Sequence, residues 1–144
     1  MWGKLSRLIA LVGLLLLPGL SAGAEGPPPA GAQAIEGVIT RQIEAFRRDD
    51  GGAAFDFATP ELQAMFGDAT RFMGMVKGMY PSVYRPRSFA FGPLATVDGA
   101  VVQEVGLIGP DGQPQTALYT MERQADGSWK IAACRLVVRA TVES

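Results

Sequence analysis

The sequence contains no histidine, and this absence excludes several kinds of chemistry. Histidine is the side chain that titrates near neutral pH, and it is the commonest protein ligand of transition metals. Nucleophile systems of the Ser-His-Asp and Cys-His types are therefore excluded, as are zinc sites with histidine ligands. A catalytic site in this chain would have to use carboxylates, tyrosines and arginines, and we expect no metal or other cofactor.

Cysteine is nearly absent as well, since Cys134 is the only one. A single cysteine cannot form a disulfide within the chain, although it could join two chains. Cys134 lies in an apolar stretch with the pattern of a strand, where free cysteine usually behaves as a small buried hydrophobic residue. We therefore expect a packing role for Cys134, with a redox role as the alternative.

The chain has no hydrophobic run long enough to span a bilayer, which takes about 20 residues. Its longest apolar run, Leu8–Leu17, follows a lysine and an arginine and is followed by small residues just before Glu25. This is the pattern of a secretory signal peptide. The sequence therefore predicts a signal peptide at 1–24, cleaved between Ala24 and Glu25. The mature protein is then expected to be periplasmic or secreted, with no stable membrane anchor.

Positive charge is sparse and scattered. The longest basic run is Arg47-Arg48, and the whole chain has 13 Lys and Arg against 14 Asp and Glu. Cleavage before Glu25 removes one lysine and one arginine, which leaves a net charge of −3. Nucleic acids and anionic membranes bind clustered positive charge. Neither is therefore an expected partner.

The chain after the signal peptide divides into a short tether and one domain. Residues 25–34 are rich in proline, glycine and alanine and have no apolar stripe, which is typical of a flexible tether. Residues 35–144 have the size of a single domain. At the start of the domain, mostly apolar residues recur at steps of three and four, and this spacing predicts an amphipathic helix. The residues of this predicted face are Ile35, Val38, Ile39, Gln42, Ile43 and Phe46.

Shorter helices are expected to follow. Ala53–Ala58 fits one helical piece, and Thr59 with the proline after it is typical of the start of another, which ends at Gly67. A further helix is expected after a cap at Asp68 or Thr70. The residues expected on its inner face are Phe72, Met75, Val76 and Met79.

The second half of the domain has the pattern of strands separated by glycine-containing turns. The expected strands are Ser88–Val97, Ala100–Ile108, Gln115–Gln124 and Ser128–Thr141. Connections this short make neighbouring strands antiparallel. The sequence therefore predicts an α+β fold, in which N-terminal helices pack on one face of a curved four-stranded antiparallel sheet.

This order of elements resembles the nuclear-transport-factor-2-like (cystatin-like) folds, in which a curved sheet wraps a long N-terminal helix into a cone. The segments AFRRDD, FATPELQAMFG, MYPSVYRPRSFAFG and LYTMERQADGSWKI resemble an uncharacterised family of exported bacterial proteins, classed as a domain of unknown function. The resemblance covers about Ile35–Val138. It implies the α+β fold and export, and it implies no activity and no binding residues.

The segment YPSVYRPR is the first candidate for a ligand site. Arg85 and Arg87 could hold an anion or a carboxylate, with Tyr84 as a hydrogen-bonding wall. The alternative is a connector between helix and strand whose tyrosines cover the edge of the core. We favour this alternative because aromatic side chains with polar tips commonly lie at such edges.

Three methionines raise the question of copper(I), since thioethers are soft ligands. At about 100° per residue, Met73 and Met75 point to opposite sides of a helix. Met75 and Met79 share a face, but that face also carries apolar core residues. We therefore expect the methionines to fill the core.

A pocket enzyme of the isomerase or hydratase type is the runner-up function. Asp56 lies between two phenylalanines, where desolvation could raise its pKa, and Tyr119 could act as the proton donor. Arg123 and Arg135 come from the strand region and could face the same cavity. The alternative is that Asp56 is exposed and that Arg123 pairs with a surface acid.

The sequence favours an exported, non-enzymatic binding or interaction module whose partner is an unknown small molecule or protein. By analogy of fold, its ligand would lie between the first helix and the sheet. A further alternative is self-association, as in a homodimer, through an outer sheet face carrying Val102, Ile108 and Leu118.

Overall fold

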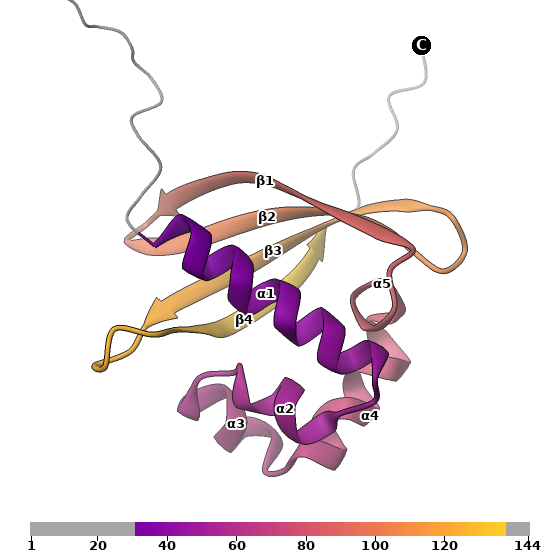
Figure 1. The fold of residues 1–144 in the computed structure, drawn as a ribbon, viewed down its shortest axis with the longest axis horizontal. Coiled ribbons are helices and arrows are strands. Elements are labelled where there is room, and N and C mark those ends of the chain that lie inside the picture. The colour runs from indigo at the N-terminus through magenta and orange to yellow at the C-terminus, as the bar shows by residue number, and fades with distance from the viewer. Residues whose placement is uncertain (1–30, 138–144) are drawn as a thin grey trace, which may run out of the picture.

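The structure is a computed structural model that describes residues 31–137. Helices come first and an antiparallel sheet follows (Figure 1). The helices are α1 Ala32–Arg47, α2 Gly51–Asp56, α3 Pro60–Phe66, α4 Ala69–Met79 and α5 Pro81–Tyr84. The strands are β1 Ser88–Val97, β2 Ala100–Ile108, β3 Pro114–Arg123 and β4 Trp129–Val137. The predicted α+β order of elements is confirmed.

Helix α1 forms because its apolar residues lie on one face at helical spacing. The predicted face is buried, including the polar Gln42, whereas Arg41 and Glu44 are exposed. The helix begins at Ala32, so its first turn includes the last three residues of the predicted tether. A helix can extend over these residues because none of them is proline or glycine.

Side-chain caps start α3 and α4, as their sequences predict. The Thr59 hydroxyl accepts a hydrogen bond from the Leu62 backbone N–H at 3.2 Å. The Asp68 carboxylate accepts one from the Arg71 N–H at 2.8 Å, so Asp68 rather than Thr70 caps α4. Between the two helices, Gly67 has a φ of 88°, a left-handed conformation that glycine adopts at little cost.

Two helical boundaries differ from the prediction. Helix α2 begins at Gly51 rather than Ala53, because the Asp50 carboxylate accepts a hydrogen bond from the Ala53 N–H and caps the helix there. The predicted connector between helix and strand contains the single turn α5, which starts at Pro81. Proline suits the first position of a helix because its ring fixes φ near the helical value.

The inner face of α4 also differs from the prediction. Phe72 and Val76 are buried as expected, but Met79 is 70% exposed and Met75 is half-buried. Met73 is buried instead, because α4 also packs against α2. A Cβ atom at Gly51 would lie only 2.9 Å from the Met73 Cγ, which shows how closely the two helices approach.

The sheet is a simple meander in the order β1-β2-β3-β4, and all its pairs are antiparallel. The predicted bounds of β1 and β2 are confirmed, β3 begins and ends one residue earlier, and the predicted end of β4 lies outside the described residues. Asp98 and Gly99 have φ values of 50° and 82° in the tight turn between β1 and β2. Both residues therefore adopt the left-handed conformation that the predicted hairpin requires.

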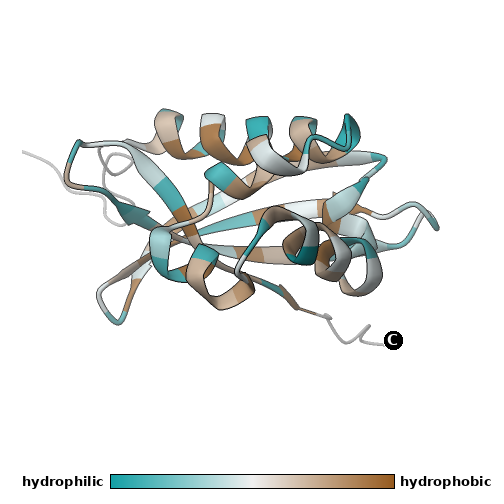
Figure 2. Cartoon of the chain, turned by 90° about the horizontal axis from the view of Figure 1, so that it is seen from below, coloured by the Kyte–Doolittle hydropathy of each residue, from teal (hydrophilic) through white to brown (hydrophobic). Residues whose placement is uncertain are grey.

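Helix α1 lies across one face of the sheet, called the inner face below, whereas α2 to α4 lie beyond the edge strand β4 (Figure 1). At this edge the Ile131 backbone bonds to Phe57 and Thr59, which adds a parallel bridge beside β4. The hairpin turns carry hydrophilic residues, and apolar and polar residues alternate along α1 (Figure 2). None of the helices in residues 31–137 is long and apolar enough to cross a membrane.

Candidate functional site

An apolar cavity lies where α1, α3 and α4 meet the edge strand β4, and it is called the pocket below. Its volume is about 270 Å³. It reaches the surface at Met79, since this residue lines it and is 70% exposed. The apolar side chains that form most of its wall include Phe46, Leu62, Phe66, Phe72, Val76 and Ile131.

An aromatic cluster holds the wall of the pocket. The Phe72 ring lies 6.0 Å from the ring of Phe46, 5.4 Å from that of Phe66 and 5.4 Å from that of Phe55. Aromatic pairs at such separations attract one another beyond the burial of their surface, by about 0.5–1.5 kcal/mol each. The cluster joins α1, α2, α3 and α4, so the wall is built before any ligand enters.

The lining residues with polar side chains are few and uncharged. They are Gln42, Tyr80 and Cys134. The Gln42 amide nitrogen donates to the Ala54 carbonyl oxygen at 3.1 Å, which fixes this side chain. No lysine, arginine, aspartate or glutamate is among the lining residues, so a charge placed inside the pocket would lack a partner there.

Tyr119, which is fully buried, lies next to Cys134, a half-buried residue of the pocket wall. They are register partners on β4 and β3, and both face α1. Tyr119 is fully buried, and its hydroxyl has no hydrogen-bond partner of ordinary geometry among the described residues. Burial raises the pKa of Tyr119 well above its ordinary value, and the neighbouring Cys134 raises it further. Burial raises the pKa of the Cys134 thiol to about 12.

Tyr84 and Arg85, two residues of the candidate anion site, contact a carboxylate of the chain itself. The Tyr84 hydroxyl donates to Asp49, and the Arg85 guanidinium lies 2.8 Å from the other Asp49 oxygen. Lys77 adds a third contact, with its Nζ atom 3.7 Å from Asp49. The hydrogen bond from Tyr84, followed by the charges of Arg85 and Lys77, lowers the pKa of Asp49. Tyr84 and Arg85 therefore tie α5 to the end of α1.

The remaining predicted arginines do not converge on one site. Arg87 lies beside Gly112 in the loop between β2 and β3, away from the Asp49 contact of Arg85. Arg123 is exposed at the end of β3, near the following turn. Arg135 pairs in register with Leu118, so its side chain is on the outer face of the sheet.

The proposed acid and base lie in different surroundings. Asp56 is exposed at the end of α2, and its backbone carbonyl accepts a hydrogen bond from Lys130 at 2.8 Å. Tyr119 is fully buried on the inner face. The structure therefore does not bring these two residues together, because α2 lies beyond the sheet edge while Tyr119 lies under α1.

The three methionines suggested for copper(I) are also separated. Met75 and Met79 line the pocket, whereas Met73 packs against Gly51 on the other side of α4.

The outer sheet face carries half-buried Val102, Ile108 and Leu118, as the strand alternation predicts. The predicted signal cleavage site between Ala24 and Glu25 lies outside the described residues.

Sequence reasoning did not identify the pocket residues as a group. Leu62 and Phe66 belong to α3, and Ile131 and Ala133 belong to β4, more than sixty residues later. Their helical and strand patterns place each on an apolar face, which is the one signal that the sequence offers. Which faces meet depends on the packing of α3 beside β4.

Residues 29–143 match a protein family described as Domain of unknown function (DUF4864). The chain belongs to this family. No curated protein and no solved structure was found to match the chain. The membership is consistent with a domain that spans all the described residues, and it assigns no activity and no ligand.

Proposed function

We propose that this domain binds a small apolar ligand in the pocket. The observation that carries the proposal is the combination of an apolar wall, an opening at Met79 and a volume of about 270 Å³. Close-packed cores contain few voids larger than a water molecule. A cavity of this size next to the surface therefore suits a ligand better than it suits packing alone.

The volume limits the size of the ligand. An apolar cavity of about 150 Å³ accommodates benzene, with its six carbons. In proportion, the pocket of about 270 Å³ suits a molecule of roughly eleven carbons. This corresponds to a medium-length chain or a two-ring aromatic compound. Full-length lipids are too large to be enclosed.

The enzyme alternative has less support. A carboxylate base and a tyrosine donor must both reach the same substrate atom or its neighbours. Asp56 is exposed and Tyr119 is buried behind the pocket, so their positions do not supply this geometry. An uncharged, apolar wall favours binding without catalysis.

We further propose that the protein is exported and that its fold is of the nuclear-transport-factor-2-like kind. Export rests on the pattern of residues 1–24. The fold assignment is supported by a curved meander sheet with a long helix lying across one face (Figure 1). Intact mass spectrometry of the protein purified from cells tests export, and we expect a chain that begins at Glu25. A chain that retains residues 1–24 would contradict it.

Titration with 2-ethylnaphthalene, a two-ring hydrocarbon of about the required size, tests the binding proposal. A ligand efficiency of about 0.5 kcal/mol per heavy atom over about 12 atoms gives a Kd of tens of micromolar. Met75→Trp places a larger side chain at a half-buried position that lines the pocket and should abolish binding. The matched control is Met65→Trp, the same substitution at a site that is 78% exposed.

The two variants separate pocket binding from adsorption to the surface. We expect wild type and Met65→Trp to bind alike, and Met75→Trp to lose at least tenfold in affinity while it remains folded. Absence of binding to wild type, or equal binding to all three proteins, would refute the proposal. Thermal unfolding gives an independent readout, because a ligand at about 100 times its Kd stabilises the folded state by about 2.7 kcal/mol.

A further inference from the structure

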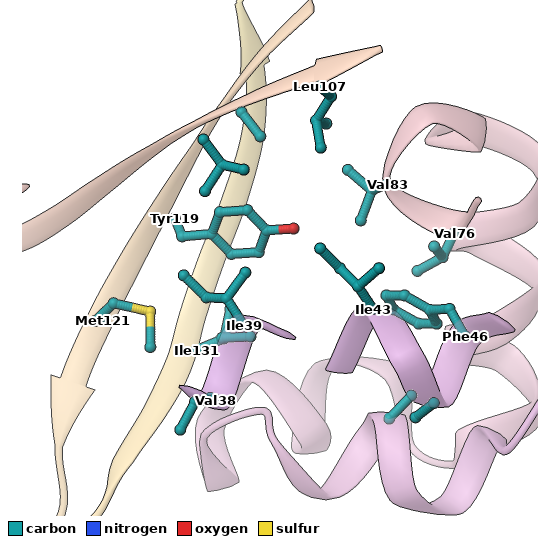
Figure 3. Close-up of a cluster of buried hydrophobic side chains, with 14 of the residues drawn as sticks. Val38, Ile39, Ile43, Phe46, Val76, Val83, Leu107, Tyr119, Met121 and Ile131 are labelled. Atoms are coloured by element: carbon teal, nitrogen blue, oxygen red, sulfur yellow. The ribbon is translucent and has the colours of Figure 1, made fainter. Parts of the chain in front are cut away.

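Gln42 is a polar residue on the apolar face of α1. It is only 3% exposed, and its neighbours on that face, Ile39, Ile43 and Phe46, belong to the cluster of buried apolar side chains (Figure 3). A glutamine amide has N–H donors at its nitrogen and an acceptor at its oxygen. Burying such a group without partners destabilises the folded state. Both ends of this buried amide therefore need a partner.

The nitrogen end of the amide has its partner within the chain. The Gln42 Nε2 atom donates to the Ala54 carbonyl oxygen at 3.1 Å. Ala54 belongs to the short helix α2, so this bond ties α2 to α1. The bond also fixes which way the amide faces, because only the nitrogen can donate to a carbonyl oxygen. The oxygen, Oε1, is therefore the end of the amide that faces away from Ala54.

The oxygen end has no partner in the described part of the chain, where no group donates a hydrogen bond to the Gln42 Oε1 atom. Unlike the Tyr119 hydroxyl, this oxygen is not fully enclosed by the core. Gln42 is one of the residues that line the pocket. The pocket wall thus contains an acceptor whose position is fixed by the bond to Ala54. A structural role in joining α1 to α2 accounts for the nitrogen and leaves the oxygen unexplained.

We propose that the ligand carries a neutral hydrogen-bond donor, such as an alcohol hydroxyl or the N–H of an indole, which donates to the Gln42 Oε1 atom. This inference rests on the proposed function, since it names the chemical class of ligand for the same pocket. The apolar body of the ligand fills the cavity, and its donor pairs with the oxygen that the fold leaves without a partner. Pockets for small molecules commonly combine an apolar wall with a few fixed polar groups.

The donor is neutral because the pocket supplies no charge. No aspartate or glutamate is among the lining residues, so the ammonium group of an amine would lose its hydration without gaining an ionic partner. A carboxylate would meet the same cost, and it has no proton to donate. The ligand class is therefore an apolar alcohol or a two-ring heteroaromatic compound with an N–H group.

Three probes of equal size test this inference. 2-Naphthalenemethanol donates a hydrogen bond, 2-methoxynaphthalene only accepts one, and 2-ethylnaphthalene does neither. The quantity measured is the affinity for each oxygen-containing probe relative to that for 2-ethylnaphthalene. It is compared between wild type and Gln42→Met, in which an apolar side chain of similar length replaces the amide. Comparing the same ratio in two proteins removes the difference in hydration between the probes.

One neutral hydrogen bond corresponds to about a fivefold change in affinity. We therefore expect the relative affinity for 2-naphthalenemethanol to fall about fivefold in Gln42→Met. The relative affinity for 2-methoxynaphthalene should not fall, because an ether has no proton to donate to Oε1. An equal fall for the alcohol and the ether would overturn the inference, since Gln42 would then favour any polar ligand.

A measurement on wild type alone complements the variant, because Gln42→Met also loses the bond to Ala54. Nuclear Overhauser effects show which side chains lie close to each group of a bound probe. We expect such effects between the CH₂ group of 2-naphthalenemethanol and the side chain of Gln42. Effects from this group to Met79 at the mouth of the pocket, with none to Gln42, would overturn the inference, because the hydroxyl would then face solvent.

The outcomes separate this inference from the proposed function. If 2-ethylnaphthalene does not bind to wild type, the pocket proposal fails, and this inference fails with it. If all three probes bind in the pocket and the relative affinity for the alcohol is the same in wild type and Gln42→Met, only the donor inference fails.

Discussion

Asp49 shows how one residue joins elements that are distant in sequence. It follows α1 with a φ of 55°, a left-handed conformation that aspartate and asparagine tolerate better than most residues. Its carboxylate contacts Tyr84, Arg85 and Lys77. The turn therefore places one negative charge where α4 and α5 both supply partners.

Replacement of Asp49 should change how stability depends on pH. The folded protein lowers the pKa of Asp49 below its ordinary value of 3.8. Its contribution is therefore present above pH 3.8 and is lost as pH falls through the lowered pKa. We expect Asp49→Asn, which keeps the backbone preference, to unfold a few degrees below wild type at neutral pH, since exposed ion pairs contribute little.

Thermal unfolding at a series of pH values from about 7 to about 2 measures this effect. The difference in Tm between wild type and Asp49→Asn should shrink toward the acidic end. A difference that stays constant over the whole series would show that the charge of Asp49 contributes nothing.

Cys134 should be unreactive in the native protein. Burial raises the pKa of its thiol from 9.0 to about 12, so little thiolate is present near pH 8. Thiolate is the species that reacts with disulfide reagents. We expect labelling by such a reagent at pH 8 to be at least about a hundredfold slower in the native protein than in denaturant. Equal rates would contradict the burial of this thiol.

At the scale of elements, the cap of α4 offers a clean test because Asp68 is exposed. Its side chain accepts a hydrogen bond from the Arg71 N–H, one of the donors that a helix start leaves unpaired. Asp68→Ala should lower the free energy of unfolding by about 1 kcal/mol. Urea unfolding measures this change in the free energy of unfolding, and Asp68→Asn is the control that keeps the cap. An alanine variant as stable as the asparagine variant would exclude capping by Asp68.

The elements were predictable from sequence where their signals are local. Thr59 and Asp68 each cap a backbone N–H three positions away, and the Asp98-Gly99 turn depends on its own backbone preferences. The buried face of α4 was less predictable. Helical spacing indicates which side chains share a face, but it does not indicate which other element packs against that face. Met73 is buried only because Gly51 of α2 lies beside it.

At the scale of the whole molecule, the fold class was predictable and the site was not. The change from helical to strand periodicity is a property of each segment, and it predicts the α+β order. The partners of candidate residues lie far along the chain, as Asp49 does for Tyr84 and Arg85. The pocket likewise forms only when α3 and α4 pack beside β4, and no local pattern specifies that contact.

The methionines allow the most direct test of the pocket as a ligand site. In protein labelled with ¹³C at the methionine methyl groups, NMR spectra recorded during titration with 2-ethylnaphthalene report each position separately. We predict the largest shifts at Met75 and Met79, which line the pocket, and no shift at Met73, which packs against α2. Absence of shifts, or a largest shift at Met65, which is 78% exposed, would contradict the account.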